Sequence, residues 1–230
     1  MTEALVFVDD VDHPELSPSD RHHIERVLRI RAGSLITVSD GAGRHCTARL
    51  GDRLAPVTGV EQTPAPEPAV AVAFALVKGD RPELIVQKLT EVGVDRIVPF
   101  VAERCVVRWE PAKADRELQR LRRIAREAAM QCRRLWLPAV EPLTTFAEVA
   151  ACPGAALAEL GGPPPGPDVR LVLVGPEGGW SPAESASSLP RVGLGAHVLR
   201  AETAAIAAGV VLTAARAARS GGTWWGSTVA

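Results

Sequence analysis

From about residue 69 onward, the chain alternates short apolar runs with helical patterns, and this alternation restricts the possible folds more than any other feature. The apolar runs cover Val70–Val77, Arg96–Val101 and Leu171–Val174. Between them lie helical patterns over Pro82–Val92 and around Arg116–Leu135. Pro82 is in the first turn of the first predicted helix, and Gly93 terminates it. Strands that alternate with helices are typical of α/β proteins with a mostly parallel sheet, so we predict this fold class.

Two further elements are expected near the end of the chain. Val198 and Leu199 indicate a short strand, and the pattern over Glu202–Arg219 indicates a closing helix. The proline- and glycine-rich stretch Gly161–Pro167 is interpreted as a surface loop, and the last ten residues, GGTWWGSTVA, as a loose tail.

The first part of the chain has a different pattern. Strand-like runs cover Leu5–Val8, Leu35–Val38 and His45–Leu50, and an Asp-Gly pair between the last two indicates a hairpin. One helix, HHIERVLRI with the residues before it, interrupts the strands; Ser17 is its expected N-cap and Asp20 completes a capping-box pattern. A small β-barrel with one inserted helix fits this order.

A proline-rich segment separates the two parts. Glu61–Pro68, EQTPAPEP, holds three prolines in eight residues, which is typical of a linker. We therefore predict two domains, residues 1–68 and residues 69–230.

Composition and charge narrow the classes of protein. With 26 basic and 27 acidic side chains the net charge is −1, so overall charge does not indicate a nucleic-acid binder. The four cysteines have no metal-ligand spacing, so we expect no metal site and interpret them as small buried residues in a reducing compartment. The N-terminus is acidic where a signal peptide needs basic residues, so we expect no signal peptide. No run of eighteen uninterrupted apolar residues occurs, so we expect no membrane helix. We expect a cytoplasmic protein with no membrane partner.

Local charge is uneven. In the helix within Lys113–Arg134, the apolar residues recur at steps of three and four and predict a buried stripe: Leu118, Leu121, Ala125, Ala128, Cys132 and Leu135. The remaining faces carry eight basic residues against three acidic ones, a local excess of five. A second basic group, Arg21, His22, Arg26, Arg29 and Arg31, lies on the N-terminal helix. Such faces are either ordinary solvated surfaces or surfaces that contact phosphates of a folded RNA.

Two glycine-rich turns adjoin apolar strands: GPEGGWSPAE from Gly175 and VGLGAHVLRAET from Val192. No GxxxxGK[ST] motif occurs, and Gly193–Val198 does not complete a dinucleotide-binding fingerprint. Neither turn contains a lysine that would meet a phosphate. Exposed backbone groups with an apolar lining suit a neutral base with a sulfonium, such as S-adenosylmethionine, unless the glycines serve only the turn geometry.

These two turns resemble the cofactor motifs of the RsmE family, the small-subunit rRNA uridine-N3 methyltransferases of the SPOUT superfamily. KGDRPELIVQKLTEVGVDRIVPF, IAREAAMQCRR and HHIERVLRIRAGSLITVSDGAG match other hallmarks of the family, so the resemblance covers nearly the whole chain. Arg133 departs from it, standing where the family usually has Gly.

The resemblance implies a fold and an activity. We expect an N-terminal PUA-like β-barrel, a C-terminal SPOUT domain with a deep trefoil knot, and a homodimer. The implied reaction is S-adenosylmethionine-dependent methylation of N3 of the uridine conventionally numbered 1498 in 16S rRNA of the small ribosomal subunit. A SPOUT ribose 2′-O-methyltransferase and a non-catalytic ribosome-assembly factor are the alternatives.

The expected site residues fall into three groups. For chemistry, Arg200 would stabilise negative charge on the uracil carbonyls, and Glu202 or Glu177 would accept the N3 proton or complement the sulfonium; we expect Arg200 and Glu202 to be the catalytic residues. The residues expected to bind the cofactor are Leu173, Val174, Gly175, Pro176, Glu177, Gly178, Gly179, Leu194, Gly195, Val198, Leu199, Arg200, Thr203 and Ala204. The residues expected to bind RNA are Arg21, His22, Arg26, Arg29, Lys78, Lys88, Arg123, Arg126, Gln131 and Arg134.

Overall fold

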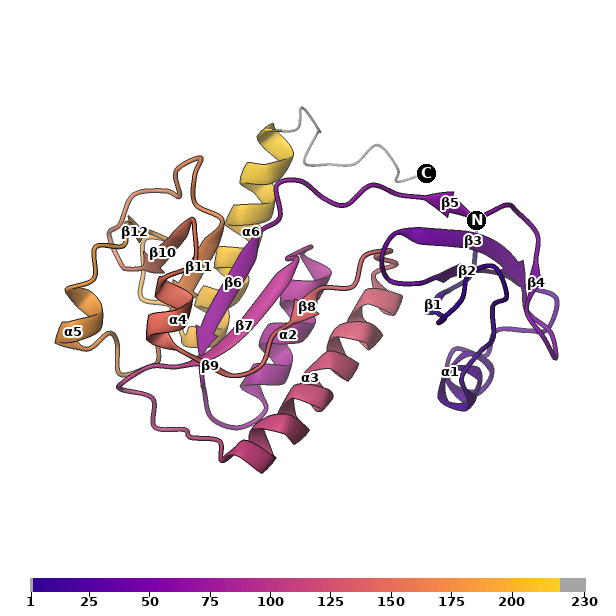
Figure 1. Ribbon diagram of the computed structural model, residues 1–230, viewed down its shortest axis with the longest axis horizontal. Helices are drawn as coiled ribbons and strands as arrows, with labels where there is room; N and C mark the ends of the chain where they lie inside the picture. The colour runs from indigo at the N-terminus through magenta and orange to yellow at the C-terminus, as the bar shows by residue number, and fades with distance from the viewer. Residues whose placement is uncertain (1, 220–230) are drawn as a thin grey trace. The chain divides into compact units, whose positions relative to one another are not determined.

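The chain forms two compact units (Figure 1). The structure, a computed structural model, describes residues 2–219. The N-terminal unit comprises residues 1–65 together with Arg126–Leu137, and the C-terminal unit comprises residues 66–125 and 138–230. The end of the long helix α3 (Pro111–Gln131) therefore groups with the N-terminal residues, which a single boundary after residue 68 does not describe.

A five-stranded sheet forms the N-terminal unit. Its strands are β1 (Leu5–Phe7), β2 (Leu35–Ser39), β3 (Arg44–Arg49), β4 (Ala55–Pro56) and β5 (Glu61–Gln62). The first two pair in parallel, and β3 pairs antiparallel with β2, β4 and β5. The predicted hairpin between β2 and β3 is confirmed. The predicted linker began too early, because Glu61 and Gln62 pair with β3.

The N-terminal helix is shorter than predicted. Ser17 caps α1 (Pro18–His22) by accepting from the Asp20 backbone N–H at 3.1 Å, as expected. The chain then forms one π-helical turn, η1 (His23–Val27), and the predicted α-helix does not continue. The wider turn buries Ile24 completely and leaves Leu28 half exposed, and Arg29 ends it with φ +55°. Local geometry here follows the burial of Ile24 rather than helix propensity.

A half-buried ion pair joins α1 to the end of α3 within the N-terminal unit. Arg126 donates to both carboxylate oxygens of Asp20, at 2.7 and 2.9 Å, and to the Phe7 carbonyl at 2.9 Å. Its guanidinium also lies 5.6 Å from the centroid of the Phe7 ring. Burial would by itself raise the pKa of Asp20, but hydrogen bonds from Arg126 and Ser17 outweigh it and hold the pKa below its usual value.

We expect Asp20→Asn to lower the free energy of unfolding at pH 7 by about 2 kcal/mol, because it removes the charge that two hydrogen bonds from Arg126 satisfy. The folded-state pKa is lowered, so the stabilisation is complete above the unfolded-state pKa of about 3.9 and is lost as the pH falls below it. Urea unfolding at pH 7 and pH 3 measures both effects. Asp12→Asn, which breaks the exposed pair with Arg44, is the control; an equal loss in both variants would contradict the prediction.

The C-terminal unit contains a parallel sheet. Its strands are β6 (Ala71–Ala75), β7 (Arg96–Val101), β8 (Ala139–Val140), β9 (Thr144–Thr145), β10 (Ala155–Ala158), β11 (Leu171–Val174) and β12 (Arg191–Val192). The order is β12-β10-β11-β6-β7-β8, with β9 also on β7, and every pair is parallel. The predicted α/β fold is confirmed. The helices are α2 (Arg81–Glu91), α3, α4 (Phe146–Ala150), α5 (Pro182–Ser185) and α6 (Ala201–Arg219).

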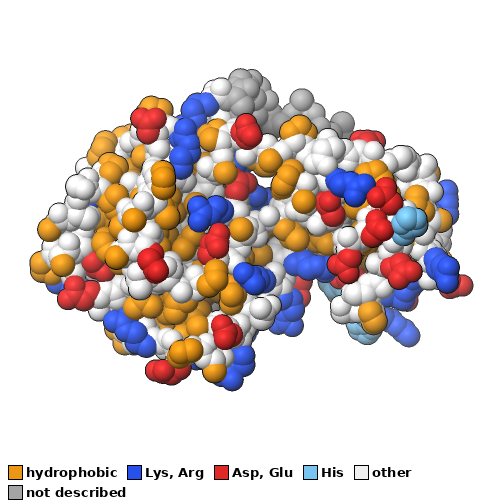
Figure 2. All heavy atoms as spheres, in the orientation of Figure 1, with side chains coloured by type: hydrophobic (Ala, Val, Ile, Leu, Met, Phe, Trp, Pro, Cys, Tyr) orange, Lys and Arg blue, Asp and Glu red, His pale blue; other side chains and the backbone are white. Residues whose placement is uncertain are grey.

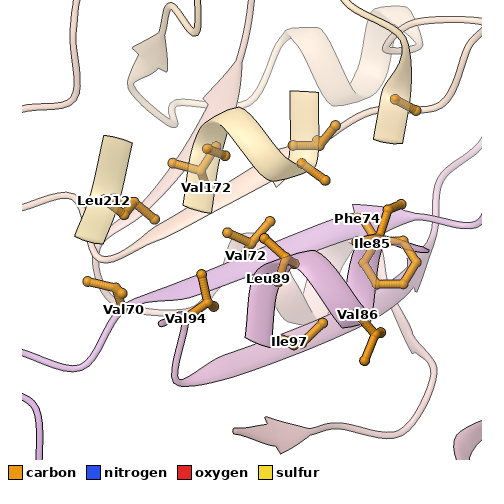
Figure 3. Close-up of a cluster of buried hydrophobic side chains, with 14 of the residues drawn as sticks. Val70, Val72, Phe74, Ile85, Val86, Leu89, Val94, Ile97, Val172 and Leu212 are labelled. Atoms are coloured by element: carbon orange, nitrogen blue, oxygen red, sulfur yellow. The ribbon is translucent and has the colours of Figure 1, made fainter. Parts of the chain in front are cut away.

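Both faces of this sheet are covered because successive strand residues are apolar on either side. On one face, Val72, Phe74 and Val172 pack with Ile85 and Leu89 of α2 and with residues of α3 and α6 (Figure 3). On the other face, Ala73, Phe100 and Leu173 pack with Val149 of α4 and with Trp180. Burial on both faces of the sheet therefore explains why these strands are apolar at successive residues and not only at alternate ones.

Three predictions about the chain after residue 68 were wrong or incomplete. Val198 and Leu199 form no strand, and Val198 is 82% exposed, so no apolar face holds it to the sheet. Helix α3 begins at Pro111 and ends at Gln131, earlier at both ends than predicted. Cys132 follows its end and is exposed, so it is not part of the buried stripe, whereas Cys46 and Cys105 are buried as expected.

Helix α6 qualifies the expectation about membranes. It is long and apolar enough to cross a membrane by length and composition alone, a test that core helices of soluble proteins also pass. In the structure it packs on α2, β6 and β11, with Ala205, Ala208 and Leu212 buried. The predicted tail, residues 221–230, lies outside the described residues.

Candidate active site

The first glycine-rich turn follows β11 and folds back over the end of β10. Gly179, with φ +69°, donates its N–H to the Pro176 carbonyl at 2.9 Å and closes the turn. The Trp180 indole N–H donates to the Ala158 carbonyl at 3.1 Å. Gly175 packs against this ring, and a Cβ there would lie 3.1 Å from it. Gly175 is therefore needed for the close approach of the turn to Trp180.

The second glycine-rich segment joins β12 to α6. Gly193 donates its N–H to the Pro163 carbonyl at 2.8 Å, which anchors the segment to the loop after β10. The chain then runs through Leu194–Leu199 without regular structure and enters α6, where the Arg200 carbonyl accepts from the Ala204 N–H at 2.8 Å. The two glycine-rich segments thus flank the same end of the sheet.

Between these segments lies a cavity of about 490 Å³. The predicted cofactor residues that line it are Val174, Gly175, Pro176, Glu177, Gly179, Leu194, Gly195, Val198, Leu199, Arg200 and Ala204. Three others, Leu173, Gly178 and Thr203, are not among its lining residues. The cavity also has walls that the sequence did not predict: Ala158, Glu159, Leu160, Trp180, His197 and Ala201. The first three follow from β10, a strand that was not predicted.

A small charge cluster lies beside this cavity. Arg81, the first residue of α2, donates to Glu177 at 2.6 Å, and its guanidinium lies 3.9 Å from Oε2 of Glu202. The Glu202 side chain is only 14% exposed, and its Oε2 is buried without a hydrogen-bond partner among residues 2–219. A buried acceptor of this kind is costly unless a donor reaches it.

Arg81 was not predicted as a site residue. It lies 96 positions before Glu177, and the two come together because β6 and β11 are neighbouring parallel strands. The only sequence signal was its place directly after a strand, in the segment KGDR. Of the residues predicted for chemistry, Arg200 lines the cavity and is exposed, whereas Glu202, the second residue of α6, is not among its lining residues.

The predicted RNA-binding residues are divided between the units. Lys78, Lys88 and Arg123 belong to the C-terminal unit, and Lys88 pairs with Glu91 at 2.8 Å. The N-terminal unit holds Arg21, His22, Arg26, Arg29, Arg126, Gln131 and Arg134. Arg126 and Arg21 have structural partners, because Arg126 binds Asp20 and Arg21 donates to the carbonyls of Gly51 and Asp52. Figure 2 shows basic side chains along α3, interspersed with acidic ones.

Comparison with known proteins places this site in a class. The family model described as an RNA methyltransferase domain matches residues 64–213, which include every residue that lines the cavity. The site and the fold are thus those of an RNA methyltransferase.

Individual relatives define the family more closely. The chain is 35% identical to ribosomal RNA small subunit methyltransferase E of Mycobacterium tuberculosis, over 81% of this chain and 80% of that protein. It is also 35% identical to the enzyme of the same name from Synechocystis, over 82% and 69%. The crystal structure of the Neisseria gonorrhoeae enzyme bound to S-adenosyl methionine is 27% identical, with a TM-score of 0.75, covering 91% of this chain and 96% of that one. The chain belongs to the ribosomal RNA small subunit methyltransferase E family, and the predicted resemblance is confirmed.

Proposed function

We propose that this chain transfers a methyl group from S-adenosylmethionine to N3 of the uridine conventionally numbered 1498 in 16S rRNA of the small ribosomal subunit. The observation that carries the proposal is the buried Oε2 of Glu202, which lies 3.9 Å from the Arg81 guanidinium but has no hydrogen-bond partner among residues 2–219, beside a cavity with apolar walls. Uridine N3 carries a proton and becomes a nucleophile only when that proton leaves, so the reaction needs an acceptor at this place.

The cavity fits the methyl donor. Its apolar residues, such as Val174, Leu194 and Leu199, suit a neutral adenine, and the glycine turn exposes backbone groups that can hydrogen-bond to the base edge. Among residues 2–219, the lining carries two carboxylates, Glu159 and Glu177, against Arg200 and no lysine, and this balance favours a neutral or cationic ligand over a pyrophosphate. Glu177, also in the lining, places negative charge where a sulfonium would be favoured. When bound, the cofactor supplies an electrophilic methyl group.

The residues around the cavity accept the proton, stabilise negative charge and position the reacting atoms. Glu202 accepts the N3 proton at Oε2, and Arg81 keeps a positive charge 3.9 Å from that oxygen. Arg200, which lines the cavity, stabilises negative charge on the uracil carbonyls. The cavity walls hold N3 and the methyl group in line.

The architecture of the assembly is also a proposal. We propose that the N-terminal unit is a PUA-like barrel that binds RNA through the basic residues predicted above, and that the C-terminal unit is a knotted SPOUT domain. The sheet order, in which β12 pairs with β10 and the chain then returns to α6 on β6 and β11, supports the knot. Leu160 and Val198 line the cavity yet are 57% and 82% exposed, which supports a homodimer that covers this rim. A cytoplasmic location follows from a ribosomal substrate.

Nucleotide-resolution mapping tests the reaction. The protein is incubated with S-adenosylmethionine and small subunits that lack the modification, and the methylated atom is identified by mass spectrometry of digested rRNA. We expect one methyl group, on N3 of one uridine in 16S rRNA. A methyl group on a ribose 2′-oxygen would identify the alternative SPOUT activity, and no transfer combined with tight RNA binding would indicate an assembly factor.

A further inference from the structure

A second cleft opens at the carboxyl end of β6, in the C-terminal unit. Its volume is about 210 Å³, and its lining residues come from three places in the sequence. The loop after β6 and the start of α2 contribute Val77, Lys78, Gly79, Pro82 and Glu83; the segment after β7 contributes Val107 and Trp109; and α3 contributes Lys113, Glu117 and Arg120. Lys78 is one of the predicted RNA-binding residues, and Lys113 and Arg120 belong to the basic group within Lys113–Arg134, for which a surface that contacts RNA phosphates was one of the two interpretations.

This cleft is a neighbour of the active-site cavity. The short loop that leaves β6 contributes Lys78 to the cleft, and three residues later it contributes Arg81. Arg81 donates at 2.6 Å to Glu177, which lines the cavity. Because β6 and β11 are adjacent parallel strands, the loops after them meet at one edge of the sheet.

The charges in the cleft favour an anion. Arg120 is paired with Glu83 at 2.7 Å, so these two charges largely satisfy each other. The side chains of Lys78 and Lys113 are exposed and have no hydrogen-bond or ion-pair partner within residues 2–219. Glu117 is the other carboxylate in the lining, so three cations stand against two anions, a net charge of +1. Two ammonium groups in one cleft without partners are available to a ligand.

The walls between these charges are rigid. Val77 and Pro82 are buried, and Trp109 packs against the hydrophobic clusters on both faces of the sheet. The cleft is therefore held by the core of the unit, while its two free ammonium groups point to a ligand that binds by charge.

We propose that this cleft binds a backbone phosphate of the rRNA strand next to the target uridine. The proposal rests on the proposed function, because a nucleotide whose base enters the cavity carries a phosphate on either side. Lys78 and Lys113 neutralise that phosphate, and Arg120, already fixed by Glu83, contributes its remaining N–H groups. Such contacts position the strand without reading its sequence.

The test is the salt dependence of binding to undermethylated small ribosomal subunits by the double variant Lys78→Gln/Lys113→Gln. Loss of the contacts to this one phosphate reduces the slope of log K against log salt by about 0.7–0.9 and weakens binding on the order of tenfold. The KM for subunits rises accordingly, whereas the affinity for S-adenosylmethionine and the rate at saturating subunits stay unchanged. Arg96→Gln, which removes one exposed charge at the opposite end of the sheet, is the control and should leave the slope unchanged.

An unchanged slope and affinity in the double variant would overturn the proposal, as would an equal change in Arg96→Gln. Binding is measured without the methyl donor, so its result is separate from the identity of the methylated atom. Wild-type methylation of N3 with no effect of the two lysines would refute the cleft alone. A normal lysine effect with methylation elsewhere would refute the proposed reaction and keep the cleft.

Discussion

Methyl transfer by Glu202→Gln is expected to be about 10²–10⁴-fold slower than by the wild-type enzyme, because the amide cannot accept the N3 proton. The carboxylate lies in the first turn of α6, only 14% exposed, with one oxygen that no group among the described residues satisfies. Gln preserves the size of the side chain and removes both the proton acceptor and the negative charge 3.9 Å from the Arg81 guanidinium. Single-turnover rates with saturating S-adenosylmethionine and undermethylated small subunits measure it.

Arg200→Ala is also expected to transfer methyl groups more slowly than the wild-type enzyme. We expect a rate loss of about 10²–10³-fold, the usual effect of removing one group that stabilises developing negative charge. Arg200 is exposed, and its backbone carbonyl, which caps α6, is retained in the variant, so the fold should be unaffected. Thermal unfolding of both variants checks this point.

The control for both is Glu141→Gln, which breaks the exposed pair with Arg96 at the amino end of β7. It should transfer methyl groups at the wild-type rate. Wild-type rates in both Glu202→Gln and Arg200→Ala would show that the chemistry lies with other residues of the cavity, of which Glu177 is the first to test.

Several elements could be predicted from the sequence because local signals agreed with the fold. β7 and β11 have the predicted bounds, since each is an apolar run between polar or turn residues. β10 was missed, because AALA is only four residues long and alanine is depleted in strands. Its place between β11 and β12 comes from tertiary pairing, which a local pattern does not contain.

The candidate site was predicted in the same uneven way. The glycine turns follow strands in the sequence, so Gly175, Leu194 and their neighbours could be assigned to one cavity from the sequence. Arg81 and the walls from β10 could not, because they reach the cavity through strand order alone. Arg133 is a position where the sequence departs from the resemblance, which implies Gly there. Its φ is +59°, in the left-handed region that favours glycine, so the backbone keeps the conformation that suits glycine.

The contact between the loops after β10 and β12 is expected to be the least tolerant point of the cavity wall. A Cβ on Gly193 would lie 2.2 Å from the Gly162 carbonyl oxygen and 3.0 Å from its carbonyl carbon. Both neighbours are backbone atoms, so no side-chain rotation relieves the clash, and the two loops must separate. The Gly193 N–H bond to Pro163 would be strained by the same movement.

Gly193→Ala should therefore lower the free energy of unfolding by about 1–3 kcal/mol, as overpacking of a close contact does. It should also weaken S-adenosylmethionine binding, because Leu194 and Gly195, the next two residues, line the cavity and move with the loop. Calorimetric titration and urea unfolding measure the two effects. Gly166→Ala, in the same loop as Gly162 but with open space around its Cβ, is the matched control and should change neither. If both variants bind the methyl donor with wild-type affinity, this contact does not shape the cavity, and the wall formed by Gly175 and Trp180 is sufficient to hold the cofactor.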